Sequence, residues 1–284
     1  MSYNAAELIL ARSMEPAIRV RPALYCGGRV TTYAELHALV NRAAQAFAGL
    51  GLQRGDRVPL LLNDGPLYVA AILGLMKIGA VVIPLNPKLK PEETKYIVGD
   101  CGAKLLVHDA IYAENLSEVA GVKLLAAAGA GDSLTRRMDC ATGHAGFAAL
   151  DAQDPCFWLY SSGTTGLPKG IIHSQRAAAE SSKLLREVLK FDETAVVLCT
   201  SKLFFAFALD NALLGVMRIG AATVLNEAWA EPEAVVELAR RHQPDVFLTV
   251  PTFFRRLLQL DAEKLAVFRD VPYFMTGGER MSAR

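Results

Sequence analysis

The sequence predicts an α/β protein with two lobes of mainly parallel β-sheet flanked by helices. Short apolar runs alternate with longer amphipathic segments along most of the chain, and glycine or proline marks most of the changes between them. Of the 284 residues 52% are hydrophobic and 21% are charged, so the chain can bury a large core and is not disordered.

The first part of the chain shows this alternation from Thr32 onward. Residues 1–30 are expected to form a lead-in with a turn at Gly27-Gly28. A helix then begins near Thr32, because Thr32 and Glu35 have the spacing of a capping box and apolar residues follow at helical spacing. The expected strands and helices that follow are 58–62, 66–78, 81–85, 91–99 and 105–108. Residues 126–153 interrupt the alternation, with small-residue surface loops expected at 126–132 and 143–149.

The second part of the chain continues the pattern after a long helix expected over 176–189. The expected elements are 195–199, 209–218, 222–225, 232–242 and 246–250. A further helix begins at Pro251-Thr252, with Phe254, Leu257 and Leu258 on its buried side, and 273–276 is a strand that ends in a glycine turn. We expect a division near residue 190, with 1–190 as a first lobe and 191–284 as a second, truncated lobe.

Composition excludes several classes of function. The net charge of +1 and the absence of a dominant Lys/Arg cluster give little support to a nucleic-acid groove. The five cysteines form no CxxC pair, which argues against a disulfide framework and a zinc site and favours the cytoplasm. The N-terminus lacks a signal-peptide pattern, and the apolar stretch 66–85 divides into a helix and a strand, so no membrane partner is expected.

The stretch 160–170, Tyr-Ser-Ser-Gly-Thr-Thr-Gly-Leu-Pro-Lys-Gly, is the strongest functional signal. It combines hydroxyls, glycines and one lysine with no acidic residue, and it therefore offers backbone N–H groups, hydroxyl donors and a cation to a polyphosphate. Apolar runs on both sides predict that the loop lies at the end of a sheet. The Walker pattern fails on spacing, because Gly163 and Gly166 are three residues apart and Gly170 follows Lys169. A dinucleotide G-x-G-x-x-G is also absent.

The string S-S-G-T-T-G-x-P-K-G resembles the phosphate-binding signature of the adenylate-forming (ANL) superfamily. The resemblance implies that the loop holds the β- and γ-phosphates of ATP, with Lys169 neutralising the departing pyrophosphate. It implies catalytic roles for Lys169, Thr164 and Thr165, and nucleotide binding by Ser161, Ser162, Gly163, Thr164, Thr165, Gly166 and Lys169. The segments 31–36 and 79–87 also resemble the family, as structural signatures rather than sites.

The segment 202–211 looks most like the benzoate-CoA ligase branch, although that branch often has Tyr at the position of Phe207. Three aromatic residues within four positions do not fit one helix face, so at least one should line a cavity. A core aromatic cluster is the alternative. The residues implied to bind the acid are Phe204, Phe205, Phe207, Asn211 and Thr252, and an N-cap role is an equally good account of Thr252. The turn implied to pass the adenine comprises Gly277, Gly278 and Glu279; a strand-ending turn is its alternative.

The resemblance ends before the family's Mg²⁺-binding glutamate, its ribose-binding aspartate and its C-terminal lid with the catalytic lysine, so no metal ligand is assigned here. It implies the N-terminal portion of an ATP-dependent carboxylate-CoA ligase, inactive as a fragment. The implied substrate is a benzoate-like or short apolar acid, activated through an acyl-adenylate. Expected partners are the acid, ATP, Mg²⁺ and coenzyme A, with a homodimer as an option. The alternatives are an adenylation domain that loads a carrier protein, and a non-catalytic nucleotide-binding module.

Overall fold

The computed structural model describes residues 3–161 and 167–280, and the chain forms two compact units. Unit 1 comprises Met1–Leu10 and Glu35–Glu180, and unit 2 comprises Ala11–Ala34 and Ser181–Arg284. The predicted division near residue 190 therefore needs correction. The chain passes into unit 2 after Glu180, and the segment Ala11–Ala34 belongs to unit 2 because its strand β1 (Pro22–Cys26) pairs with β10 (Ala222–Leu225).

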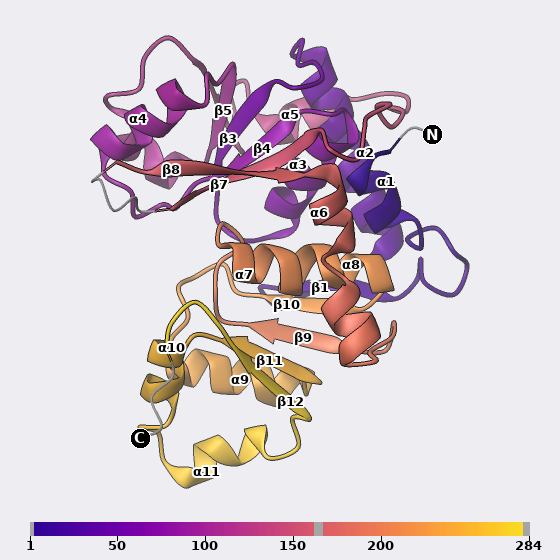
Figure 1. Ribbon diagram of the computed structural model, residues 1–284, viewed down its shortest axis with the longest axis vertical. Coiled ribbons are helices and arrows are strands. Elements are labelled where there is room, and N and C mark those ends of the chain that lie inside the picture. Colours follow the sequence, from indigo (N-terminus) through magenta and orange to yellow (C-terminus); the bar gives the residue numbers. More distant parts are fainter. Residues whose placement is uncertain (1–2, 162–166, 281–284) are drawn as a thin grey trace. The chain divides into compact units, whose positions relative to one another are not determined.

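Unit 1 contains a six-stranded sheet in the order β6-β5-β3-β4-β7-β8, and Figure 1 shows its strands and helices with their labels. All pairs are parallel except the antiparallel hairpin β7–β8. The strands are β3 (Arg57–Leu61), β4 (Val81–Pro84), β5 (Leu105–His108), β6 (Lys123–Ala126), β7 (Pro155–Ser161) and β8 (Lys169–Ser174). The helices are α1 (Ala5–Leu10), α2 (Tyr33–Gly49), α3 (Pro66–Lys77), α4 (Pro91–Asp100), α5 (Leu134–Asp139) and α6 (Gln175–Glu180), with a 3-10 helix at Ala110–Leu116.

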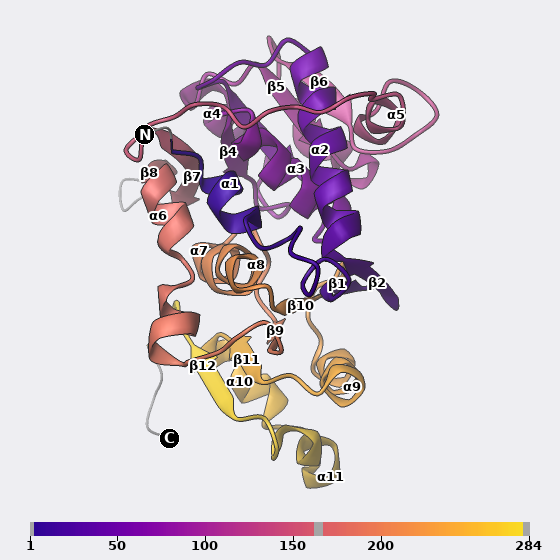
Figure 2. The same cartoon turned by 90° about the vertical axis from the view of Figure 1, so that its right-hand side faces the viewer.

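Unit 2 contains a second six-stranded sheet in the order β12-β11-β9-β10-β1-β2, which Figure 2 shows from another side. Its pairs are parallel except for the hairpin β1–β2, so the predicted α/β class with mainly parallel sheets is confirmed. The strands not yet given are β2 (Arg29–Thr32), β9 (Val196–Cys199), β11 (Val246–Thr249) and β12 (Tyr273–Thr276). The α-helices are α7 (Ala206–Ala208), α8 (Gly215–Ile219), α9 (Pro232–His242), α10 (Pro251–Leu257) and α11 (Ala262–Leu265), with π turns at Leu184–Val188 and Leu209–Leu214 and a 3-10 turn at Ala266–Phe268.

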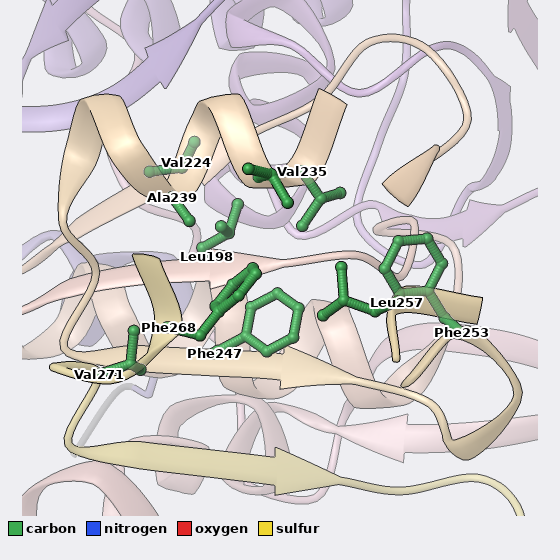
Figure 3. Close-up of a cluster of buried hydrophobic side chains, with 10 residues drawn as sticks. Leu198, Val224, Val235, Ala239, Phe247, Phe253, Leu257, Phe268 and Val271 are labelled. Carbon is green, nitrogen blue, oxygen red and sulfur yellow. The ribbon is translucent and has the colours of Figure 1, made fainter. Parts of the chain in front are cut away.

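The central strands are buried along their whole length because they are covered on both faces. Every residue of β4, β10 and β11 is buried, as expected for parallel strands with helices on both sides. In unit 2 the side chains of β11 and α9 meet in one cluster, with Phe247 against Phe268 at 5.0 Å between ring centroids (Figure 3). This packed layer includes Leu198 of β9 and Phe247 of β11, two strands that lead to predicted pocket segments.

Four expectations about individual elements were wrong. Residues 1–30 contain α1, β1 and β2, and the two glycines of the predicted turn both have positive φ, 55° and 77°, which a tight hairpin needs. Residues 127–132 and 143–149 have no helix or strand, but the missed helix α5 lies between these two loops, because Ser133 accepts the amide of Arg136 at 3.4 Å and caps a helix whose Leu134 is fully buried.

The helix expected over 176–189 ends at Glu180. Ser181 is engaged by tertiary partners instead, since its hydroxyl donates to Asp210 Oδ1 at 3.1 Å and its carbonyl lies close to the backbone of Gly215. In α10 the N-cap is Val250 rather than Thr252, and Leu258 is 57% exposed rather than buried. No helix within the described ranges is both long and apolar enough to cross a membrane.

Candidate active site

The hairpin β7–β8 holds the two described ends of the predicted phosphate loop. Ser161 is the last residue of β7 and pairs in register with Lys169, the first residue of β8. Both residues are exposed. The other predicted loop residues, Ser162, Gly163, Thr164, Thr165 and Gly166, lie outside the described residues.

One register step further in, a tyrosine anchors the hairpin. Tyr160 pairs with Gly170, and a Cβ on Gly170 would stand 3.1 Å from the Tyr160 ring, so a larger residue there would have to push the ring by a few tenths of an ångström. The Tyr160 hydroxyl donates to Asp100 Oδ2 at 2.6 Å, at the end of α4. Burial, together with this hydrogen bond to Asp100, raises the pKa of Tyr160, so the phenol stays a donor.

The cation at the hairpin end is available to a ligand. Among residues 3–161 and 167–280, no carboxylate forms an ion pair with Lys169, whereas other lysines such as Lys104 and Lys264 have one. An exposed ammonium attracts anions, and phosphate groups are its natural partners. The role of Lys169 in charge stabilisation stays a prediction.

In unit 2, polar groups gather where parallel strands end. The carboxyl ends of parallel strands are where open α/β sheets bind their ligands. Thr200 follows β9 and Thr249 ends the neighbouring β11, and their hydroxyl oxygens are 2.8 Å apart. Thr249 pairs in register with Thr276, the last residue of β12, so the Gly277-Gly278 turn begins at this same edge.

The predicted acyl and adenine segments meet at one contact. A Cβ on Gly277 would lie 3.0 Å from two ring carbons of Phe207, so the phenyl ring lies directly against the Gly277 backbone. The Asn211 side chain donates through Nδ2 to the carbonyl of Phe207 at 2.9 Å and so braces the turn that carries the ring. The ring of Phe207 and the backbone of Gly277 thus form one wall, which is uncharged.

The other predicted contacts form two further groups. Phe204 is buried, whereas Phe205 is 48% exposed, and their ring centroids are 4.2 Å apart. The Thr252 hydroxyl donates to the Glu279 carboxylate, which links α10 to the glycine turn. Phe204 therefore belongs to the core, as the alternative held, and Phe205 and Phe207 are the aromatic rings left to meet a ligand.

Sequence reasoning overlooked two side chains that position these segments, Tyr160 and Lys202. Tyr160 lies inside the quoted loop string, but no local pattern shows that it reaches Asp100, which is 60 residues away. Lys202 opens the aromatic segment and is 7% exposed, and its ammonium binds main-chain carbonyls that follow β10. A lysine that begins an otherwise apolar segment was the one available signal.

A family model of the AMP-binding enzymes matches residues 17–284. The chain belongs to this family. The resemblance to adenylate-forming enzymes is thereby confirmed. Within the described residues of this AMP-binding chain, no group of three His, Cys, Asp or Glu side chains could hold a metal ion.

Curated relatives of this AMP-binding chain include ligases of aromatic acids. It is 33% identical over 288 residues to 3-hydroxybenzoate–CoA ligase of Aromatoleum sp. (strain CIB), covering 99% of the chain and 55% of that protein. It is 37% identical over 266 residues to benzoate–CoA ligase of Thauera aromatica, covering 90% and 50%. The chain thus spans about half the length of the curated relatives it matches.

Solved structures agree with the observed fold. A benzoate CoA ligase from Burkholderia xenovorans LB400 superimposes with a TM-score of 0.89 at 27% identity, over 98% of this chain and 56% of that one. The anthranilate CoA ligase AuaEII, solved in complex with anthranoyl-AMP, gives a TM-score of 0.83 at 27% identity, over 92% and 52%. The two units are therefore those of the N-terminal domains of such AMP-binding enzymes.

Proposed function

We propose that the protein containing this chain is an ATP-dependent aryl-CoA ligase that activates benzoate or a substituted benzoate. The observation that carries the proposal is the wall formed by the Phe207 ring and the Gly277 backbone at the carboxyl edge of the unit 2 sheet. A flat, uncharged wall of this kind suits an aromatic ring and offers no partner to a charged substrate tail.

The reaction that we assign proceeds in two steps. A carboxylate oxygen of the acid attacks the α-phosphorus of ATP in line, and pyrophosphate leaves, which gives the acyl-adenylate. The sulfur of coenzyme A then attacks the acyl carbon, the thiol proton is lost, and AMP leaves with the C–O bond electrons. For the first step the chain would supply position and charge through Lys169 and Ser161, which pair in register at the end of the hairpin. Mg²⁺ bound with ATP supplies further charge neutralisation.

Carboxylate-dependent exchange of pyrophosphate into ATP tests the proposal on the whole protein. We expect exchange with benzoate and 3-hydroxybenzoate, weaker exchange with short aliphatic acids, and none with a dicarboxylate whose second charge would meet the uncharged wall. Exchange that needs no coenzyme A, followed by thioester formation only when coenzyme A is added, supports the two-step scheme. Absence of exchange with every acid of the panel contradicts it.

A carrier-protein adenylation domain makes the same adenylate, so the acceptor has to be tested separately. We expect the aryl-adenylate to be discharged by free coenzyme A. Discharge only by the phosphopantetheine thiol of a carrier protein would move the assignment to that class. Tight ATP binding without any turnover would instead favour a non-catalytic nucleotide-binding module.

A further inference from the structure

Lys202 is a buried lysine whose ammonium binds two main-chain carbonyls. Its side chain follows β9, is 7% exposed, and donates through Nζ to the carbonyl of Asn226 at 2.5 Å and to that of Glu227 at 2.9 Å. Asn226 and Glu227 follow directly after β10, which is the parallel neighbour of β9. One ammonium therefore ties together the two loops that leave adjacent strands at their carboxyl ends.

The chemistry of the contact requires a compact cation. An ammonium has three N–H donors and no acceptor, so it can serve both carbonyls and still present charge to an aromatic face. The indole of Trp229 occupies that position, with its ring centroid 5.9 Å from the Lys202 nitrogen. A methionine would fill the same space but leave both carbonyls without this donor.

The contact extends from the ammonium to the predicted acyl pocket through a chain of rings. Trp229 meets Phe204 edge-on at 6.1 Å between centroids, and Phe204 meets Phe205 at 4.2 Å. The amide of Phe205 donates to the carbonyl of Lys202 at 3.0 Å, which closes the turn from which α7 starts. Phe207, whose ring lies on Gly277, is the second residue of that helix.

We infer that Lys202 is a positioning residue that sets which aromatic acids the site accepts. The Lys202 clamp, meaning Lys202 with the carbonyls of Asn226 and Glu227 and the ring of Trp229, fixes where the segment 202–207 leaves β9. It thereby fixes the exposed face of Phe205 and the ring of Phe207. The acyl role of this segment rests on the proposed function, whereas the clamp itself is a property of the fold.

The clamp is tested first without activity. The chain has two tryptophans, and Trp158→Phe leaves Trp229 as the only indole. In that background Lys202→Met is expected to shift the Trp229 emission and to raise its quenching by iodide, because the ring loses its cation and its fixed loop. Lys264→Met, a change of a partly exposed lysine in α11 of the same unit, is the matched control and should leave the emission unchanged.

The pocket role is tested by kinetics on the whole protein. Lys202→Met is expected to lower kcat/KM for benzoate about 10- to 100-fold, chiefly through KM, and to flatten the preference between benzoate and 3-hydroxybenzoate, while the KM for ATP stays unchanged. Lys202→Arg keeps the charge and should recover part of both the emission and the benzoate KM. If Lys202 were merely structural, its loss would lower kcat/KM for all substrates equally.

Two outcomes overturn the inference. One is an unchanged Trp229 emission in folded Lys202→Met protein; the other is an unchanged ratio of benzoate to 3-hydroxybenzoate turnover. If Lys202→Met does not fold, Trp229→Leu breaks the ring chain while the lysine stays, and it must then reproduce the rise in benzoate KM. If the unmodified protein activates no acid, the proposed function fails, and the emission measurement still decides whether the clamp exists.

Discussion

Replacing Gly277 by alanine perturbs the wall of the proposed acyl pocket at one defined point. The added Cβ would stand 3.0 Å from both Cδ2 and Cε2 of Phe207, which is tighter than nine in ten real Cβ contacts. The ring or the turn must therefore shift by a few tenths of an ångström. Gly277 is not among the residues with positive φ, so the alanine brings no backbone strain of its own.

The size of the effect follows from the packing. Overpacking of a fitted contact by one methyl group costs about 1–3 kcal/mol. If this free energy is lost from the binding of the acid, the KM for benzoate rises about 5- to 140-fold, since about 1.4 kcal/mol corresponds to a factor of ten. The KM for ATP should rise less than the KM for benzoate, because the added Cβ points at Phe207 and only the backbone of this turn is implied to pass the adenine. Initial rates of benzoate-dependent pyrophosphate exchange measure both constants.

The neighbouring glycine supplies the control. A Cβ on Gly278 would meet only Val250, at 3.9 Å, but Gly278 has a φ of 84°, so Gly278→Ala adds backbone strain without touching the ring. Combining Gly277→Ala with Phe207→Leu should remove most of the penalty, as expected for two residues in contact. A benzoate KM within twofold of the unmodified protein in folded Gly277→Ala, or equal effects of the two alanines, refutes the reasoning.

Three further predictions concern unit 1. Lys169→Ala should slow pyrophosphate exchange by about 10²-fold or more while shifting the free energy of unfolding by less than about 0.5 kcal/mol, because the side chain is exposed and acts on charge; an unchanged rate removes it from the mechanism. Tyr160→Phe loses the hydrogen bond to Asp100 and should destabilise by about 1 kcal/mol in urea, with Tyr96→Phe in the same cluster as the near-neutral control. Burial and nearby cations lower the pKa of His37 below 6.5. As the pH falls, the unfolded chain therefore binds a proton on His37 at a higher pH than the folded chain does, and the free energy of unfolding should fall as the pH drops through about 6.5. Urea titrations at pH 7.5 and 5.5 should show a smaller fall for His37→Asn.

Local sequence patterns were enough to predict the strands and helices whose own residues decide their structure. The strands Leu105–His108 and Ala222–Leu225 and the helix Pro232–His242 have the predicted bounds, because apolar runs and a proline start are local signals. The strand Pro22–Cys26 was missed for the opposite reason. Its parallel partner is β10, which lies far along the chain, and nothing within residues 1–30 indicates that pairing.

The candidate site also has features that the local sequence predicts and features that it does not. The sequence predicted that the three phenylalanines of segment 204–207 could not share one environment, and the structure separates them into a buried, an exposed and a wall-forming ring. What it could not predict is the partner of each ring, because Phe207 follows β9 while Gly277 follows β12, two strands that are separated by β11 in the sheet. The wall thus depends on the register Thr249↔Thr276, which sets how far β12 extends before the chain turns. A single methyl group at Gly277 therefore tests the register of the sheet and the choice of substrate together.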